Sequence, residues 1–175
     1  MSNKVLIVVD MQNDFIYGPL GSEEARKIVP NVIEKIEEAV RLGRTVIFTR
    51  DTHSANYLNT QEGKNLPVPH CIRHTEGWEI IPELKKYIDY KWVVDKFSFG
   101  YDCWEEGALP LLPDGIELVG VCSDICVISN ALILKALYFE TEITVDASCC
   151  AGTTPENHRA ALQVMKSCQI NVIGE

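Results

Sequence analysis

The chain has 175 residues, a length that favours one domain and is sufficient to bury a hydrophobic core without disulfide or metal staples. Its formal net charge of −9 argues against a nucleic-acid-binding protein, because such proteins need a basic face. Hydrophobic residues make up 46% of the chain, an ordinary value for a globular protein, and no apolar run approaches the length of a membrane-spanning helix.

The first apolar run, in "MSNKVLIVVD", ends at Asp10 and lacks the length and the small-residue cleavage site of a secretory signal. We therefore expect a cytoplasmic protein that does not associate with membranes. Seven cysteines, an odd number without regular spacing, suit free thiols in a reducing compartment better than a disulfide framework.

Six short apolar runs predict β-strands. They are rich in β-branched residues and mostly continuous rather than alternating, which is typical of strands buried on both faces of a parallel sheet. In chain order the runs lie at residues 5–9, 45–49, 92–94, 117–121, 142–145 and 170–173.

Helical patterns lie between these runs. The stretch 29–42 has an apolar face that includes Val32, Ile36 and Val40, and Gly43 offers a stop at its end. This alternation of strands and helices predicts an open, doubly wound α/β sheet.

Two further helices are expected in the second half of the chain. One covers about 123–139, and the other starts near Thr154, which can cap a helix whose first residue is Pro155. Residues 51–77 have no clear periodicity, and long loops in compact domains are usually functional or disordered. Three of the four histidines lie in this segment, which favours a functional loop.

Polar residues follow the first four runs, where ligands bind in open α/β sheets. An acid, a lysine and a cysteine at three strand ends can converge on one crevice, although strand ends are often polar only because they reach solvent. These residues are Asp10, then Arg50 and Asp51, then Asp95 and Lys96, and finally Cys122 and Cys126.

Cys126 is predicted to lie in the first turn of a helix that Ser123 or Asp124 can cap. The free N–H groups and the helix dipole at this position favour a thiolate and lower the cysteine pKa, and they can also hold an oxyanion. Cys122 is expected to pack at the strand–turn junction. The pair has CxxxC spacing rather than CxxC, so it only weakly resembles a redox motif.

A second cluster consists of Asp51, His53 and His70, with Glu62 and His74 as further candidates. Two imidazoles and a carboxylate suit zinc, iron or manganese and can leave a coordination position open. The alternative is that these are unliganded loop histidines exposed to solvent.

Six motifs in order resemble the isochorismatase-like cysteine hydrolases, and within them the nicotinamidases. The resemblance covers nearly the whole chain and implies one hydrolase domain over residues 1–175, with a six-stranded parallel sheet and helices on both faces in a Rossmann-like three-layer sandwich. The motifs are "VLIVVDMQNDF", "TRDTH", "PHC", "DKFSF", "GVCSDICV" and "TPENHRAAL".

The resemblance assigns a catalytic triad to Asp10, Lys96 and Cys126, the residues that the strand ends already indicate. It also implies a cis peptide bond at Val121–Cys122 and an oxyanion hole formed by the backbone N–H groups of Cys122 and Cys126. In the nicotinamidase branch, Asp51, His53 and His70 match the ligands of a divalent metal, zinc first among the candidates, and some members add a glutamate for which Glu62 is the natural match. No organic cofactor is implied.

One position departs from the family. Nicotinamidases carry a tryptophan three residues before the last ligand histidine, where this chain has Pro67, and that tryptophan walls the substrate ring. Phe15 and Tyr101 are therefore predicted to line the substrate pocket. Phe97, Phe99 and Trp104 are further candidates for this aromatic wall. Core packing is the alternative for each of these rings and is favoured for all except Phe15.

The expected function is hydrolysis of a small amide to an acid and ammonia through a thioester, with a nicotinamidase-like activity first. The alternatives are a related hydrolase of an N-carbamoyl compound, another amide or a vinyl ether, and a non-catalytic binding protein on the same fold. The expected partners are a small-molecule amide and further copies of the chain in a homo-oligomer.

Overall fold

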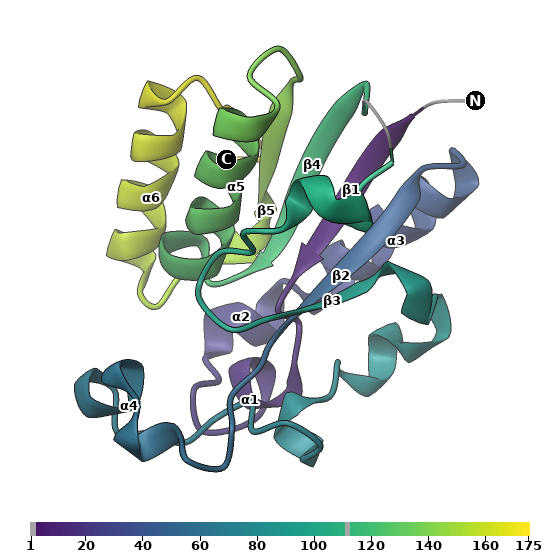
Figure 1. The fold of residues 1–175 in the computed structure, drawn as a ribbon. Helices are drawn as coiled ribbons and strands as arrows, with labels where there is room; N and C mark the ends of the chain where they lie inside the picture. Colours follow the sequence, from purple (N-terminus) through teal and green to yellow (C-terminus); the bar gives the residue numbers. More distant parts are fainter. Residues whose placement is uncertain (1–2, 111–112) are drawn as a thin grey trace.

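The computed structural model describes residues 3–110 and 113–175, and its centre is a six-stranded sheet in which every strand pair is parallel (Figure 1). All six predicted strands are confirmed. They are β1 (Lys4–Val9), β2 (Thr45–Asp51), β3 (Val93–Lys96), β4 (Gly115–Val121), β5 (Ile143–Ala151) and β6 (Asn171–Ile173).

The strand order is β3-β2-β1-β4-β5-β6. The chain therefore adds strands outward on one side from β1 to β3 and on the other side from β4 to β6. The direction changes between β1 and β4. In open α/β sheets a ligand site forms at such a switch point, outside the carboxyl ends of the strands.

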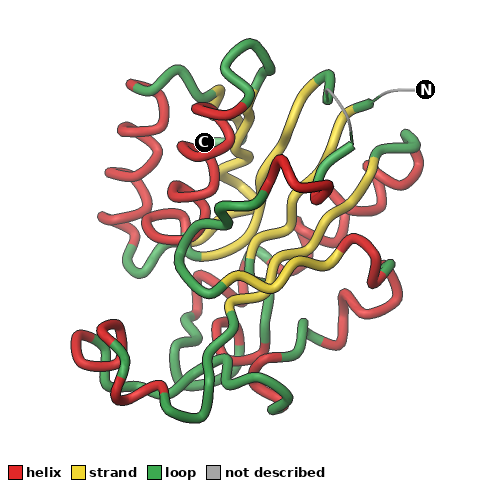
Figure 2. Tube along the Cα trace, viewed as in Figure 1, coloured by secondary structure: helices red, strands yellow, loops and turns green. Residues whose placement is uncertain are grey.

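Helices cover both faces of the sheet, as predicted (Figures 1 and 2). On one face, α3 (Val29–Arg41) packs with the shorter α1 (Asn13–Ile16) and α2 (Glu23–Lys27) around one apolar cluster. On the other face, α5 (Ile128–Leu137) and α6 (Pro155–Ser167) pack around a second cluster. The result is a three-layer α/β/α arrangement, which agrees with the fold that the resemblance implies.

Helix α3 buries Val32 and Ile36 as predicted, but Val40 is 56% exposed and the prediction for this residue is wrong. Ala39 takes the buried position instead, because it lies three residues after Ile36 and so stays on the face that points to the sheet. Gly43 ends the helix with a φ of 66°, a left-handed conformation that costs glycine little.

The helices of the second half also form where they are expected. A short helical turn over Ser123–Val127 leads directly into α5. Helix α6 starts at Pro155, and the side chain of Thr154 accepts a hydrogen bond of 3.1 Å from the backbone N–H of Asn157. None of the helices in the described ranges is long and apolar enough to cross a membrane.

The segment 51–77 lies beyond the carboxyl ends of the strands and holds more helix than its sequence indicates. Its central element is α4 (Gln61–Asn65), where the hydroxyl of Thr60 accepts a hydrogen bond of 3.0 Å from the N–H of Gly63. The other short helical turns in the described ranges are η1 (Tyr57–Asn59), η2 (Glu76–Trp78), η3 (Pro82–Tyr87), η4 (Tyr90–Trp92) and a turn at Trp104–Ala108.

Candidate active site

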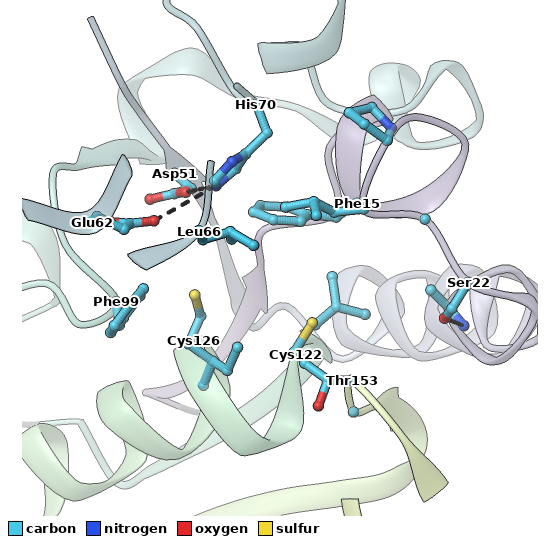
Figure 3. A pocket seen from close by; sticks show the side chains of 17 residues that line it. Phe15, Ser22, Asp51, Glu62, Leu66, His70, Phe99, Cys122, Cys126 and Thr153 are labelled. Atoms are coloured by element: carbon cyan, nitrogen blue, oxygen red, sulfur yellow. Dashed lines mark hydrogen bonds and ion pairs between the residues drawn. The ribbon is translucent and has the colours of Figure 1, made fainter. Parts of the chain in front are cut away.

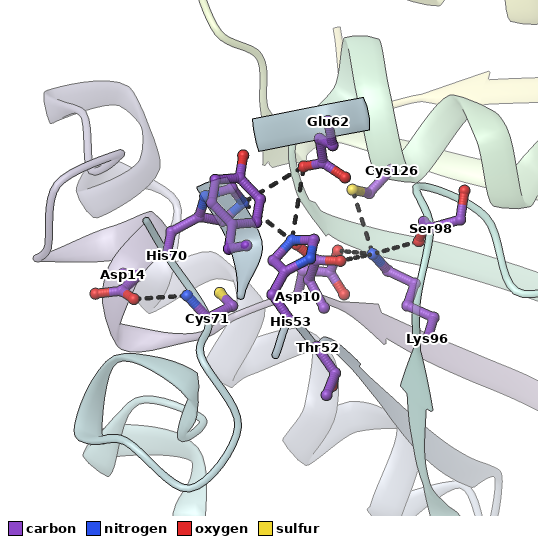
Figure 4. Close-up of polar contacts among 12 residues, drawn as sticks. Asp10, Asp14, Thr52, His53, Glu62, His70, Cys71, Lys96, Ser98 and Cys126 are labelled. Atoms are coloured by element: carbon purple, nitrogen blue, oxygen red, sulfur yellow. Dashed lines mark hydrogen bonds and ion pairs between the residues drawn. The ribbon is translucent and has the colours of Figure 1, made fainter. Parts of the chain in front are cut away.

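Lys96, the last residue of β3, joins the polar groups that the strand ends bring together (Figure 4). Its Nζ lies 2.7 Å from Asp10 Oδ2, 3.2 Å from Asp51 Oδ1 and 3.4 Å from Cys126 Sγ. The side chains of Lys96 and Asp10 are both fully buried. The acid, the lysine and the cysteine named from the sequence therefore meet around one ammonium group.

Asp10 is held in a strained conformation at the end of β1. Its φ is 49°, a value that non-glycine residues rarely adopt and that tends to mark functional sites. The Thr49 hydroxyl donates a hydrogen bond of 2.6 Å to Asp10 Oδ1 and accepts one of 3.1 Å from the Asp10 N–H. Thr49 thus fixes one carboxylate oxygen and leaves the other to face Lys96.

Cys126 lies in the turn between β4 and α5, where its backbone carbonyl accepts a hydrogen bond of 2.8 Å from Asn130 Nδ2. The peptide bond between Val121 and Cys122 is cis. All seven cysteines are free thiols, and Cys122 lines the cavity beside Cys126.

The prediction that Cys126 has a lowered pKa is wrong. Burial raises the pKa of this thiol well above its ordinary value; Lys96 lowers it, while the carboxylates of Asp10 and Asp51 raise it further. The helix start alone does not outweigh this desolvation.

The other two members of this group have complementary pKa shifts. Burial raises the pKa of Asp10, and the neighbouring Lys96 opposes that shift. Burial lowers the pKa of Lys96, but Asp10, Cys126 and Asp51 outweigh it, so its pKa lies well above the ordinary value. These shifts favour the charged form of Lys96 and make Asp10 a stronger proton acceptor than an ordinary aspartate, as a general base requires.

Asp51, His53, Glu62 and His70 form a second cluster, the ligand cluster, whose ligand atoms all lie within 4.8 Å of one another. Asp51 Oδ2 lies 2.9 Å from His53 Nε2 and 3.5 Å from His70 Nε2. Glu62 Oε1 lies 3.6 and 3.7 Å from the same two nitrogens. His74 lies outside the cluster and packs edge-on against Trp78.

These residues fit a divalent cation. His70 Nδ1 lies 2.8 Å from the carbonyl of Val68, a contact that directs Nε2 into the cluster, as is usual for metal-binding histidines. Counted as ionised, the carboxylates of Asp10, Asp51 and Glu62 bring three negative charges to the site, and the buried Lys96, in contact with Asp10 and Asp51, brings one positive charge. A doubly charged ion would balance the two remaining negative charges.

The ring of Tyr57 packs against both histidines of the ligand cluster. Its ring centroid lies 4.7 Å from that of His53 and 5.0 Å from that of His70, and its hydroxyl donates a hydrogen bond of 2.9 Å to the Leu66 carbonyl. Gly63 packs so tightly on this residue that an added Cβ would lie 2.1 Å from the Tyr57 carbonyl oxygen. Tyr57 and Gly63 therefore fix the position of α4 and of Glu62.

A cavity of about 420 Å³ opens above Cys126 and reaches the ligand cluster (Figure 3). Phe15 forms one wall, as predicted, with its ring centroid 5.5 Å from that of His70. Leu66 and Phe99 also line the cavity, whereas Pro67 does not. Phe99 is 44% exposed, so the expectation that it packs in the core is wrong.

Tyr101 is the predicted pocket residue that the structure places elsewhere. Its ring packs edge-on against the fully buried Trp104 at a centroid distance of 5.1 Å, and its backbone N–H donates to Asn130 Oδ1. The reason is that the chain turns inward after Phe99, toward α5. Phe97 remains 70% exposed outside the cavity.

Sequence reasoning missed residues that position the site. Gln12 accepts a hydrogen bond of 2.7 Å from the Asp51 N–H and donates one of 2.9 Å to the Asp51 carbonyl. Its place two residues after Asp10 in "VVDMQNDF" was the available indication. Ser123 and His158 are a second example, because the serine hydroxyl lies 2.8 Å from His158 Nδ1 and ties the cysteine turn to α6.

Fold and site together define a doubly wound α/β protein with an Asp–Lys–Cys group beside a four-residue ligand cluster at the switch point. Residues 4–174 match the family described as the Isochorismatase domain, and the chain belongs to this family. Nicotinamidases are among its relatives, which supports the nicotinamidase-like branch.

Three similarities illustrate the relationship. The chain is 25% identical to the nicotinamidase of Saccharomyces cerevisiae over 97% of this chain and 99% of that protein. It is 32% identical to a probable inactive nicotinamidase of Arabidopsis thaliana, covering 94% of this chain and 89% of the other. The structure of the pyrazinamidase of Pyrococcus horikoshii in complex with zinc superposes with a TM-score of 0.79 at 26% identity, covering 99% of both chains.

Proposed function

We propose that the protein is a cysteine-dependent hydrolase of small amides, with a nicotinamidase-like conversion of an aromatic amide to its acid and ammonia as the first candidate. The observation that carries the proposal is the contact of Cys126 Sγ with Lys96 Nζ at 3.4 Å, while the same ammonium lies 2.7 Å from Asp10, at the floor of a cavity walled by Phe15.

In this mechanism Asp10 accepts the proton of the Cys126 thiol as the sulfur attacks the amide carbon. The positive charge of Lys96 stabilises the developing thiolate, which the high pKa of the resting thiol makes necessary. Asp10 then gives the proton to the departing ammonia as the C–N bond breaks. A water molecule deprotonated by Asp10 attacks the thioester, the C–S bond breaks to release the acid, and Asp10 returns the proton to the Cys126 sulfur.

The backbone N–H groups of Cys122 and Cys126 are the proposed oxyanion hole. Both belong to the turn after β4 that presents the sulfur, so carbonyl binding and attack use the same element. One such donor typically contributes about 3–4 kcal/mol to transition-state stabilisation.

Asp51, His53 and His70, with Glu62, would hold a divalent metal, and zinc is the first candidate. The pyrazinamidase complex with zinc supports this assignment, as do the two unbalanced negative charges of the site. When bound, the metal would supply a Lewis acid that holds the substrate ring. Asp51 would then contact both the metal and Lys96, through its two oxygens.

A second candidate is hydrolysis of a different small substrate by the same machinery. The specific reason is the pocket wall: Leu66 lines the cavity, and Pro67 replaces the tryptophan that is typical of nicotinamidases. A non-catalytic binding protein is a weaker alternative. One relative is described as probably inactive, but Asp10, Lys96 and Cys126 are all present here and in contact through Lys96.

Ammonia release from a panel of small amides, including nicotinamide, tests the proposal. We expect turnover by the wild type and none by Cys126→Ala, because that variant has no nucleophile. Cys168→Ala is the matched control, since Cys168 is an exposed cysteine after α6. Amide hydrolysis by Cys126→Ala equal to that of the control would refute the cysteine mechanism.

A further inference from the structure

The cavity extends past Cys126 on the side away from the ligand cluster. Its lining includes Asp51 from β2, Cys122 after β4, and Gly152 and Thr153 after β5. Because the strand order is β2-β1-β4-β5, the cavity crosses the carboxyl edge of the sheet from the ligand cluster, over the nucleophile, to the end of β5. Neighbouring strands are about 4.8 Å apart, so this path is about 15 Å long.

Figure 3 shows the same arrangement: Glu62 and Phe99 lie on one side of Cys126, while Thr153 and Ser22 lie on the other. We call the second part the β5 arm. It is lined by Leu20, Gly21, Ser22, Ala25, Gly152 and Thr153.

The walls of the β5 arm are suited to an apolar group. Leu20 and Ala25 supply aliphatic surface. The hydroxyl of Ser22 already accepts a hydrogen bond of 3.0 Å from the N–H of Ala25, and that of Thr153 donates one of 2.5 Å to Asp124. The Thr153 hydroxyl is therefore engaged in holding the β5–α6 loop, while the Ser22 oxygen caps α2 as an acceptor.

The charges of the cavity favour an uncharged occupant. Among residues 3–110 and 113–175, no lysine or arginine lines the cavity, while Asp51 and Glu62 contribute carboxylates to it. The cation nearest the nucleophile, Lys96, is buried against Asp10 and Asp51. A carboxylate in the β5 arm, on the far side of Cys126 from the ligand cluster and its proposed metal, would therefore lose its hydration without gaining a counter-charge.

The size of the cavity indicates a substrate larger than one ring. A volume of about 420 Å³ lies within the range of sites that enclose drug-sized ligands. A single ring placed between Phe15 and the ligand cluster, with its amide over Cys126, would leave the β5 arm to water. Since ammonia is the leaving group in the proposed reaction, whatever fills this arm belongs to the acyl group.

We propose that the β5 arm is a subsite for an uncharged, apolar extension of the acyl group, so that the preferred substrates are neutral carboxamides with two fused rings or an apolar ring substituent. This inference rests on the proposed amide hydrolysis and adds no step to it. The C–N bond is replaced by the bond to Cys126 Sγ, ammonia leaves with the proton from Asp10, and water releases the larger acid.

The test compares kcat/KM for 2-naphthamide with kcat/KM for benzamide, since the two differ by one fused ring. We expect the ratio to exceed one in the wild type. Leu20→Trp should fill the arm and lower the ratio about 10-fold or more. Leu42→Trp is the matched control with an unchanged ratio, because Leu42 is 43% exposed after α3 and lies outside the cavity.

If the tryptophan variant does not fold, Leu20→Phe provides the same test with a smaller added side chain. The inference is overturned if the wild type hydrolyses benzamide but not 2-naphthamide, or if the folded Leu20 variants keep the wild-type ratio. It is also overturned if 2-naphthamide with a carboxylate on the second ring is the better substrate. No ammonia from any amide, nicotinamide included, would instead refute the proposed function on which the inference rests.

Discussion

Two clusters in this molecule place one lysine between two carboxylates, and they differ in what surrounds the lysine. In the first, Lys96 contacts Asp10 and Asp51 at the carboxyl edge of the sheet. In the second, Lys35 of α3 lies 2.9 Å from Glu117 of β4 and 2.6 Å from Asp146 of β5.

The charges of the second cluster balance one another. Arg44 adds a cation 3.1 Å from Glu117, so two positive charges meet two negative charges. The Ser148 hydroxyl donates a hydrogen bond of 2.6 Å to the remaining oxygen of Asp146. The Lys35 side chain is 17% exposed, and within the described part of the chain no cysteine or histidine is in hydrogen-bond contact with these charges.

The first cluster is unbalanced by comparison. The Lys96 side chain is fully buried, a thiol lies 3.4 Å from it, and Asp51 points its second oxygen at two histidines. A charge pair that is balanced and partly solvated connects a helix to a sheet. When the same pair is fully desolvated and placed beside a nucleophile, its field acts on that nucleophile instead.

The largest expected contrast comes from removing each lysine. Lys96→Met should lower kcat for amide hydrolysis by about 10³-fold or more, because the thiolate loses its cation and Asp10 loses its partner. Lys35→Met should keep kcat and instead lower the midpoint of thermal unfolding. A loss of about 2 kcal/mol corresponds to about 4–8 °C for a chain of this size.

Ammonia release at saturating amide and thermal unfolding of the two variants are the measurements. Similar losses of kcat in both variants would show that the clusters are not distinct in role. A folded Lys96→Met protein with wild-type kcat would remove Lys96 from the mechanism.

The two clusters were not equally predictable from the sequence. The predicted strand ends and the sequence motifs both indicated Asp10, Lys96 and Cys126. Apolar runs show where parallel strands end, and the carboxyl ends of parallel strands lie at the same edge of the sheet. Nothing in the sequence linked Lys35 with Glu117 and Asp146, since a helix and two strand interiors must first be packed together before these charges meet. The strands themselves were predictable because burial on both faces leaves a continuous apolar pattern.

The pocket walls were harder to predict for a related reason. Phe15 was identified, whereas Phe99 and Tyr101, which follow the end of β3, lie in a segment without periodicity. Which of these two rings faces the cavity depends on Asn130, whose side chain binds the Tyr101 N–H at 2.9 Å and the Phe99 carbonyl at 3.2 Å. The high pKa of Cys126 likewise follows from burial, which local sequence does not reveal.

An effect of intermediate size should come from the metal proposed for the ligand cluster, which shares Asp51 with the first cluster. Added Zn²⁺ should raise the unfolding midpoint of the wild type, as any ligand of the folded state does. Gly63→Ala should weaken zinc affinity about 10- to 100-fold, since its Cβ would press on the Tyr57 carbonyl and displace Glu62. Isothermal titration calorimetry measures that affinity directly.

Gly115→Ala is the matched control, because a Cβ there would have its nearest contact at 3.6 Å, an ordinary distance to the Lys4 side chain. Equal zinc affinity in the two glycine variants would contradict the role given to α4. Zinc binding that survives His53→Ala undiminished would place the metal elsewhere.

The smallest effect is a pH-dependent change in stability at the second cluster. Burial raises the pKa of Asp146, but Lys35 and Ser148 outweigh it, so that the pKa lies below its ordinary value of 3.8. A carboxyl group with a lowered folded-state pKa stabilises the protein above its unfolded pKa, and this contribution is lost as the pH falls through the folded value. Asp146→Asn should therefore be about 2 kcal/mol less stable at pH 7.

The difference between Asp146→Asn and the wild type should narrow below about pH 4 as the wild-type carboxylate takes up its proton. Urea unfolding at pH 7 and at successively lower pH measures it. A gap that stays constant through this range would mean that the side-chain shape, not its charge, stabilises the second cluster. Because Asp146 does not line the active-site cavity, kcat at pH 7 should not change, which separates this cluster from the one around Lys96.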